Sequence, residues 1–154
     1  MQLHPIIRQA TRDDLPHIIR LLANDPLGSQ RECYQDPLPP RYYAAFTEID
    51  ADKNNHLIVV EFEDKIIGAL QLTFIPYLTH QGSKRAQVEG VRIDEAYRGK
   101  GIGQLMMQWA IDKSRAAGCS MMQLTTDKER RPKAAPFYQK LGFSITHEGL
   151  KLLL

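Results

Sequence analysis

The stretch from Arg98 to Gly103 reads RGKGIG and places three glycines at alternate positions with two cations among them. Glycine loses more conformational freedom on folding than any other residue, so three in six positions call for a reason beyond turning the chain. A glycine-rich turn that opens a helix leaves backbone N–H groups pointing outward at the positive end of the helix dipole. The stretch therefore predicts a binding site for an anion such as a phosphate.

Two familiar glycine motifs for nucleotides do not fit these residues. The triphosphate loop needs G-x-x-x-x-G-K-[ST], but Gly101 follows Lys100, and Asp94 stands five positions before Gly99. The dinucleotide motif G-x-G-x-x-G fails on spacing, because the third glycine is Gly103, and no acidic residue lies about twenty positions further on. The six residues do match the pattern [QR]-x-x-G-x-[GA].

A second block, AAPFYQKLGF at Ala134 to Phe143, is similar to A-x-x-[LF]-Y-x-K-x-G-F. With both patterns, nearly the whole chain resembles the GCN5-related N-acetyltransferase (GNAT) family, whose pyrophosphate loop for acetyl-coenzyme A has the first pattern. The resemblance implies that the strand backbone around Val91 to Ile93 pairs with the pantetheine arm and polarises the thioester carbonyl. Many members carry Asn at the position of Arg131. The implied coenzyme-binding residues are Val91, Arg92, Ile93, Arg98, Gly99, Lys100, Gly101, Ile102, Gly103, Gln104 and Arg131.

Acetyl transfer to an amine requires an amine without its extra proton, a donor to the carbonyl oxygen and a proton for the leaving thiolate. The resemblance implies that Tyr138 is the general acid, since a phenol with a pKa near ~10 can protonate a thiolate whose pKa is roughly 8.5. The alternative is that Tyr138 only packs, because Ala134, Phe137 and Leu141 form a helical stripe with it.

Glu89 is the candidate base, which in the family acts through water. Regular alternation would place Glu89 on the same strand face as Val91 and Ile93, where a carboxylate needs a function or a partner. A bulge, which family members often carry in this strand, would change that register. The alternative is a carboxylate that is satisfied by Arg85 or Arg92.

Strands and helices alternate along the chain. Predicted strands cover 6–9, 56–63, 66–75, 86–93 and 121–126, with two short strands in 143–154. Predicted helices cover 13–23, 41–50 and 133–141, and one begins at Ile102 and ends before Gly118. The proline-rich segment 24–40 is predicted to be irregular. These elements form one mixed α/β domain over 1–154, and the resemblance implies a twisted, mostly antiparallel sheet whose central parallel strand pair splays open for the coenzyme.

Composition narrows the functional classes. The chain is 43% hydrophobic and 25% charged, and its net charge of +2 is too small to favour a nucleic-acid partner. No apolar run approaches the ~20 residues that span a bilayer, and the five histidines lack metal-site spacing. Cys33 and Cys119 are expected to be free thiols. We therefore expect a cytoplasmic protein without a metal, membrane or nucleic-acid partner.

The predicted function is direct transfer of acetyl from acetyl-CoA to a primary amine of a small molecule. Residues 125–151 loosely resemble members that act on small amines such as aminoalkylphosphonates, and segments 24–43 and 74–77 are expected to line the acceptor site. The alternatives are acetylation of peptide or protein N-termini and a coenzyme-A-binding module without turnover. A homodimer is expected from the family alone.

Overall fold

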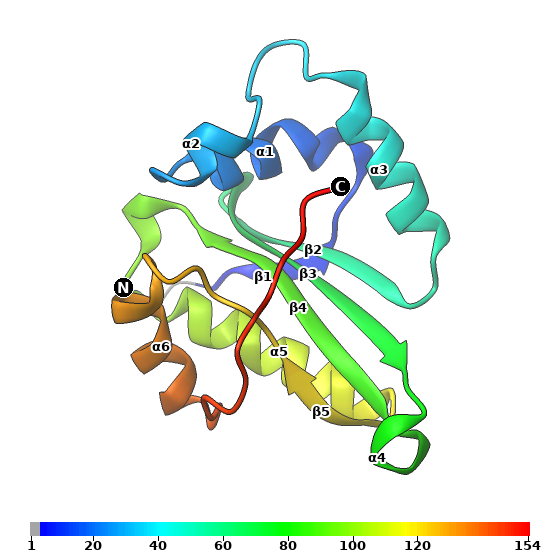
Figure 1. Cartoon of the computed structure of the whole chain (residues 1–154). Coiled ribbons are helices and arrows are strands. Elements are labelled where there is room, and N and C mark those ends of the chain that lie inside the picture. The colour runs from blue at the N-terminus through cyan, green and yellow to red at the C-terminus, as the bar shows by residue number, and fades with distance from the viewer. Residues whose placement is uncertain (1–3) are drawn as a thin grey trace. The chain divides into compact units, whose positions relative to one another are not determined.

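The computed structural model describes residues 4–154, and the chain divides into two compact units, Met1–Gln123 and Leu124–Leu154. The first unit contains β1 (Ile6–Gln9), α1 (Leu15–Ala23), α2 (Gly28–Arg31), α3 (Pro40–Ala51), β2 (Asn55–Phe62), β3 (Lys65–Pro76), α4 (Thr79–Gly82), β4 (Lys84–Ile93), α5 (Ile102–Ala116) and β5 (Cys119–Gln123). Short 3₁₀ turns cover Arg12–Asp14 and Glu95–Tyr97. The second unit contains α6 (Arg131–Lys140). The predicted mixed α/β class is confirmed (Figure 1).

The five strands form one sheet in the order β1-β2-β3-β4-β5. Neighbouring strands are antiparallel except β4 and β5, which run parallel, as predicted. The parallel pairing extends from Lys84 opposite Cys119 to Gln87 opposite Gln123. Because β4 continues to Ile93, its last six residues have β3 on one side and no pairing with β5 on the other. The parallel pairing therefore ends at Gln87, where β5 itself ends at Gln123.

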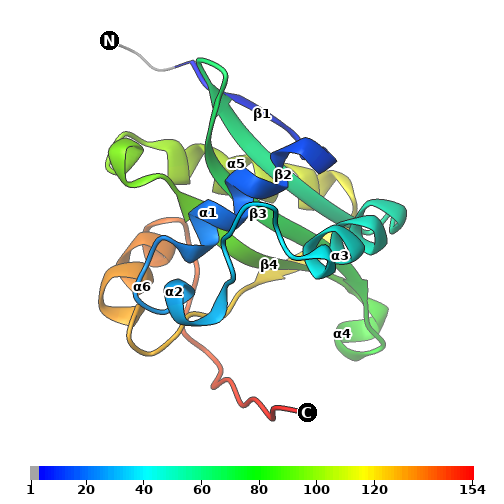
Figure 2. The ribbon, with the colours of Figure 1, turned by 90° about the horizontal axis from the view of Figure 1, so that it is seen from above.

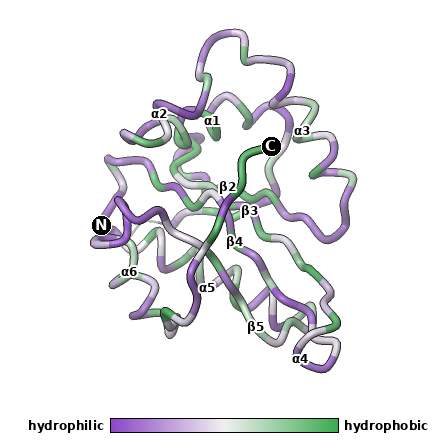
Figure 3. The backbone as a smooth tube through the Cα atoms, in the orientation of Figure 1, coloured by the Kyte–Doolittle hydropathy of each residue, from purple (hydrophilic) through white to green (hydrophobic). Residues whose placement is uncertain are grey.

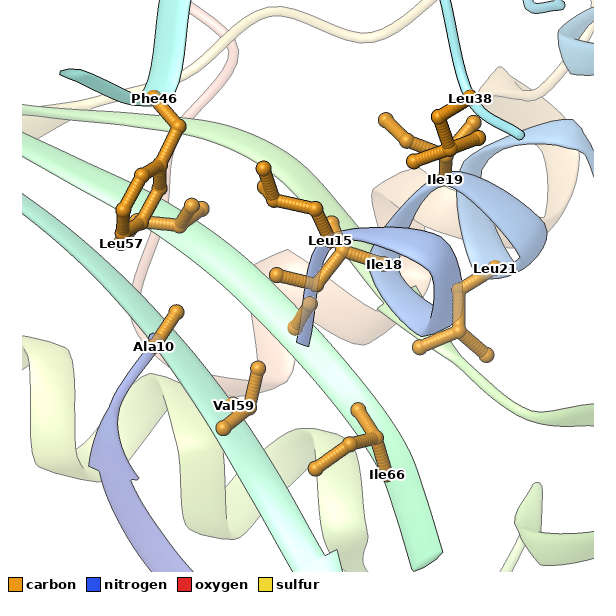
Figure 4. Packing of buried hydrophobic residues seen from close by; sticks show 11 residues of the cluster. Ala10, Leu15, Ile18, Ile19, Leu21, Leu38, Phe46, Leu57, Val59 and Ile66 are labelled. Carbon is orange, nitrogen blue, oxygen red and sulfur yellow. The ribbon is translucent and has the colours of Figure 1, made fainter. Parts of the chain in front are cut away.

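Helices α1 and α3 cover one face of the sheet and α5 covers the other (Figures 1 and 2). Helix α1 forms because its apolar residues recur at helical spacing and bury against the sheet. Figure 4 shows the resulting core, with Ile18 and Ile19 above Val59 of β2 and Phe46 of α3 beside Leu57. This packing fixes the position of the strands that carry the candidate site.

The opposite face packs against α5 through side chains that are fully buried. Met106, Met107 and Ala110 of α5 have no exposed surface. A Cβ on Gly68 of β3 would lie only 2.9 Å from the Met106 sulfur and 3.3 Å from the Arg92 carbonyl oxygen, so helix and strand approach closely at this glycine. The start of the long helix therefore packs closely beside the end of β4.

The C-terminal region differs from the prediction. No residue of 143–154 is in a strand, and β5 covers Cys119–Gln123 instead of 121–126. The apolar residues of the tail suit β structure, but a strand is stable only when a neighbouring strand pairs with it, and the tail has none. The side chains of Leu150, Leu152, Leu153 and Leu154 are exposed, and they form the hydrophobic end of the tube in Figure 3.

Other expectations concern cysteines, membranes and metals. Cys33 and Cys119 are free, as predicted, and partial burial raises the pKa of the Cys119 thiol. Across residues 4–154, no helix has the length and apolar character that crossing a membrane requires. The same residues contain no group of three or more His, Cys, Asp or Glu side chains arranged to hold a metal ion.

Candidate active site

The glycine loop lies between the end of β4 and the start of α5. Gly99 and Gly101 both adopt left-handed backbone conformations, with φ of 72° and 82°. Gly101 is the N-cap of α5, and the N–H of Leu105 donates the first helical bond to its carbonyl at 3.0 Å. The three amides before Leu105 therefore precede the first helical hydrogen bond, as at any helix start. The loop directs these donors and the positive end of the dipole at one point.

The space around the two glycines is open. A Cβ built on Gly99 or Gly101 would have no atom within 4 Å, so packing does not require glycine there. The positive φ angles do, because such a conformation costs an L-residue roughly 1–2 kcal/mol. Beside the loop lies an open hollow of about 310 Å³, lined by Gly101, Gln104, Leu105 and Gln108. The loop is thus an uncovered backbone cradle that side chains would narrow.

The two cations of the loop have different surroundings. Arg98 is exposed, and its Nε donates to the carbonyl of Ile93 at 3.2 Å. Lys100 is exposed, with its Nζ 5.1 Å from the centre of the Tyr97 ring. Both side chains therefore remain accessible to an anion, although Arg98 is partly held against the end of β4.

A bulge in β4 changes the orientation of Glu89 from the one expected. Gln71 of β3 pairs with Glu89, whereas Ala69 pairs with Arg92, so two steps along β3 correspond to three along β4. The extra residue falls at Gly90, which has a φ of 62°. Paired residues share a face, so Glu89 lies on the face of Arg92. Ile93 pairs with Gly68, so it lies on the opposite face, and the expectation from regular alternation that Glu89 and Ile93 share a face is wrong. The cause is the bulge that family members often carry in this strand.

The Glu89 side chain is exposed, and its Oε1 accepts a hydrogen bond from Nε2 of Gln87 at 3.1 Å. Among the described residues it forms no ion pair with Arg85 or Arg92. The Nε of Arg92 instead lies 3.4 Å from Oδ2 of Asp25. The structure thus does not support the alternative in which an arginine satisfies Glu89.

The backbone predicted to contact the pantetheine arm lies just beyond the bulge. The carbonyl of Val91 accepts from Nη1 of Arg92 at 2.8 Å, and that of Ile93 accepts from Arg98. Three groups of predicted residues therefore follow one another along the chain at the end of β4, namely Glu89, the strand 91–93 and, after the turn Glu95–Tyr97, the loop 98–104. A shared strand end and helix start bring them together.

Two predicted residues, Arg131 and Tyr138, belong to the second unit. Arg131 is exposed at the first position of α6, where proline at the next position is well tolerated. Tyr138 is half-buried, with its ring 5.0 Å from that of Phe137 and 5.7 Å from that of Phe143. The ring therefore packs within this unit through its edges and faces, as the helical stripe predicted.

The sequence analysis missed some residues that bear on the site. Gln87 and Gln123 connect to Glu89 through hydrogen bonds, and alternation along β4 would have placed Gln87 beside it. The Asp25 contact to Arg92 had no sequence signal, because it joins distant segments. Phe74, expected in the acceptor wall, is instead buried on the other side of the strand, with its ring 5.2 Å from His56.

Comparison with known proteins agrees with this geometry. A crystal structure from Bacillus halodurans C-125, described as a transcriptional regulator, has a TM-score of 0.95 and 52% identity, and the match covers 98% of this chain and 100% of that one. Glucosamine 6-phosphate N-acetyltransferase of Trypanosoma brucei brucei is 32% identical over 88 residues, which is 57% of each chain. Aminoalkylphosphonate N-acetyltransferase of Salmonella typhimurium is 25% identical over 96 residues, 62% of this chain and 61% of that protein. The chain thus spans less than two thirds of the length of either enzyme.

The family model for the acetyltransferase (GNAT) family matches residues 23–143. This range contains β4, its bulge, the glycine loop and the start of α5, and it extends through α6. The family inferred from the two sequence motifs is confirmed. The chain belongs to the acetyltransferase (GNAT) family, whose enzymes use acetyl-CoA.

Proposed function

We propose that residues 1–154 act as a single catalytic domain that moves the acetyl group of acetyl-CoA directly onto a primary amine of a small molecule. The observation that carries the proposal is the pair of left-handed glycines, Gly99 and Gly101, at the start of α5. Their uncovered amides fit the diphosphate of coenzyme A, with Arg98 and Lys100 beside them. Arg131 would add a further cation to this anionic ligand.

The two related enzymes support a small acceptor. They are named for glucosamine 6-phosphate and for aminoalkylphosphonates, and both of these are small molecules with an amine and an anionic group. Acetylation of peptide N-termini stays the alternative within the same chemistry. It predicts that peptides with free N-termini turn over faster than any small amine.

Each proposed role meets one demand of the reaction. Acetyl-CoA supplies the acetyl group as a thioester. Glu89, exposed and held by one hydrogen bond, takes the amine proton, directly or through water, so that the nitrogen lone pair can attack the carbonyl carbon. Backbone N–H groups of β4 beyond the bulge stabilise the oxygen as it gains charge. When the carbon–sulfur bond breaks, the Tyr138 hydroxyl gives its proton to the leaving thiolate, and the resulting phenolate takes up the second proton that the nitrogen loses as the amide forms.

The first test changes the glycine loop. We expect Gly101→Ala to weaken acetyl-CoA binding at least tenfold in calorimetry, because a Cβ narrows the cradle and the left-handed backbone becomes strained. Gly118→Ala is the matched control, since Gly118 also has a positive φ, of 78°, and no neighbour within 4 Å of a Cβ, but follows the other end of α5. The control should lose similar stability and keep its affinity. Equal affinities in the two variants would contradict the proposal.

A second measurement separates an enzyme from a binding module. The Bacillus halodurans relative is described as a regulator, which favours a module that senses coenzyme A as the second candidate. We expect free thiol to be released from acetyl-CoA in an amine panel, and Glu89→Gln and Tyr138→Phe each to lower kcat more than tenfold. Tight acetyl-CoA binding without acetylated product, in the wild type, would favour the module.

A further inference from the structure

Four uncharged polar side chains form one row across the sheet, on the face that α1 and α3 partly cover. Asn55 of β2 pairs with Thr73 of β3, Thr73 pairs with Gln87 of β4, and Gln87 pairs with Gln123 of β5. Paired residues point to the same face, so the four side chains stand side by side. We call them the polar row. All four are half-buried, which leaves part of each accessible.

Members of the polar row bond to one another and to neighbours on the same face. Oγ1 of Thr73 donates to Oδ1 of Asn55 at 2.6 Å, and Nε2 of Gln123 donates to Oε1 of Gln87 at 2.7 Å. Hydroxyl and amide groups can each accept and donate further bonds. A row of this kind on an accessible sheet face suits a ligand that carries several hydroxyl groups.

Two charged residues of β4 flank the row, with Glu89 on one side and Arg85 on the other. Nη1 of Arg85 donates to Oε1 of Gln123 at 3.3 Å, and Gln123 bonds through Gln87 to Glu89. A chain of three hydrogen bonds thus connects a cation to the candidate base. The charges are separated by four residues of an extended strand, or about 13 Å between Cα atoms.

Among residues 4–154, Arg85 differs from the other strand arginines of this face because it has no carboxylate partner. Arg8 and Arg92 both form ion pairs with aspartates. Within residues 4–154, Arg85 contacts only neutral groups, namely Gln123, the hydroxyl of Thr79 at 2.9 Å, and the Tyr77 ring at 4.2 Å. Its Nε is buried and has no hydrogen-bond partner among these residues. Nη1 and Nη2 each make one of these bonds and each keep a second N–H, so the guanidinium can still donate to a phosphate or phosphonate through its terminal nitrogens.

We propose that the polar row is the acceptor site of the proposed acetyltransferase, that Arg85 binds an anionic group of the acceptor, and that Glu89 marks the end where the amine lies. The acceptor is a hydroxylated primary amine with a phosphate or phosphonate distant from the nitrogen. This inference rests on the proposed function, because only the transfer reaction assigns an amine to the Glu89 end. Arg85 is thereby the specificity-determining residue for the anion.

The test compares amines with and without phosphate. Glucosamine and glucosamine 6-phosphate form one pair, and 2-aminoethanol and 2-aminoethyl phosphate form a shorter one. We expect kcat/KM of the wild type to be at least tenfold higher for the phosphorylated member, most clearly in the longer pair. In Arg85→Met the ratio of kcat/KM for the phosphorylated amine to that for its neutral counterpart should fall at least tenfold. Arg85→Lys should lose an intermediate amount, since lysine keeps the charge without the fork.

The matched control is Arg115→Met, which removes the same charge from an exposed position near the end of α5. It should keep the full preference for phosphorylated amines, and thermal melting should show that all variants are folded. A phosphate preference that survives Arg85→Met would overturn the assignment. If no amine turned over at all, the proposed function would fail separately, and calorimetry would decide the anion site: binding of glucosamine 6-phosphate that Arg85→Met abolishes supports it, and no binding to the wild type refutes it.

Discussion

Two arginines at opposite ends of one sheet face have different kinds of partner. At the β1 end, Nη1 and Nη2 of Arg8 donate to the two carboxylate oxygens of Asp14 at 2.7 and 2.9 Å. Its Nε donates to Oε2 of Glu61 at 2.6 Å. At the β4–β5 end, Arg85 contacts amide, hydroxyl and ring groups. The first arginine is neutralised within the fold. The second carries its charge into an accessible, polar region.

The side chains between these ends follow the same division. Near β1 the face is apolar, and Leu57 and Val59 pack in one cluster with residues of α1 and α3 (Figure 4). Ala69 belongs to the same cluster. Towards β5 it becomes the polar row. Apolar burial contributes about 25 cal/mol per Å², whereas a hydrogen bond between neutral groups contributes a net ~1 kcal/mol. The β1 end should therefore supply stability, and the β4–β5 end should be free to serve recognition.

The sharpest test of this division compares a core residue with a polar one. Ile18→Ala should lower the free energy of unfolding by about 2–5 kcal/mol, because it leaves a cavity between α1 and the sheet. Thr73→Val keeps the shape and removes one hydroxyl, so it should cost about 1 kcal/mol or less. Urea unfolding measures both. Comparable losses would show that the polar row is as structural as the core.

A second prediction concerns acid and the Arg8 end. Burial alone would raise the pKa of Asp14, but hydrogen bonds from Arg8 and from the Thr11 N–H outweigh it and hold the pKa below its usual value. A lowered pKa means that the folded state binds fewer protons than the unfolded state, so this contribution is present above about pH 4 and is lost as the pH falls further.

Asp14→Asn should accordingly destabilise the protein by about 2 kcal/mol at pH 7, since bonds to charged groups are worth roughly 1.5–3 kcal/mol. The gap to the wild type should narrow below about pH 4 in urea unfolding. Asp13→Asn makes the same change at an exposed neighbour and should shift stability by less than ~0.5 kcal/mol at either pH. A gap for Asp14→Asn that is constant with pH would show that its charge is not what stabilises the fold.

The sequence sufficed to predict the apolar end of the face and the glycine loop. Helical spacing of Leu15, Ile18 and Ile19 identified α1, and the RGKGIG pattern located the start of α5. Both signals are local, because they depend on neighbours within a few residues. The same holds for β1 and for the β2–β3 hairpin, whose β-forming residues and turn lie within one short segment.

The polar end was harder to predict because its features depend on strand register. The bulge at Gly90 moves Glu89 to the face of Arg92, and alternation in the sequence alone cannot reveal an extra residue opposite β3. The polar row draws one residue from each of four strands, so no single segment shows it. The prediction of two strands in 143–154 was wrong for a related reason. The composition of this tail suits β structure, but its residues pair with no strand.

The smallest expected effect is on kcat and comes from the residue that holds the candidate base. It would test most directly whether the β4–β5 end serves recognition and catalysis and not stability. Gln87 donates to Oε1 of Glu89 and is itself held by Gln123, so it is a positioning residue that fixes the carboxylate. Gln87→Met keeps the length of the side chain and removes the donor. We expect kcat to fall about threefold to tenfold, or roughly 1 kcal/mol in the barrier, with KM for acetyl-CoA unchanged and the free energy of unfolding altered by less than ~1 kcal/mol.

Steady-state kinetics beside urea unfolding provides the two readouts. Gln9→Met makes the same replacement at an exposed position of β1 and should leave both kcat and stability as they are. If Gln87→Met lost stability in proportion to its loss of rate, the amide would be a structural element like Asp14. A lower kcat at constant stability would instead show that the hydrogen bonds of the β4–β5 end orient a reacting group, which is what the contrast between Arg8 and Arg85 implies.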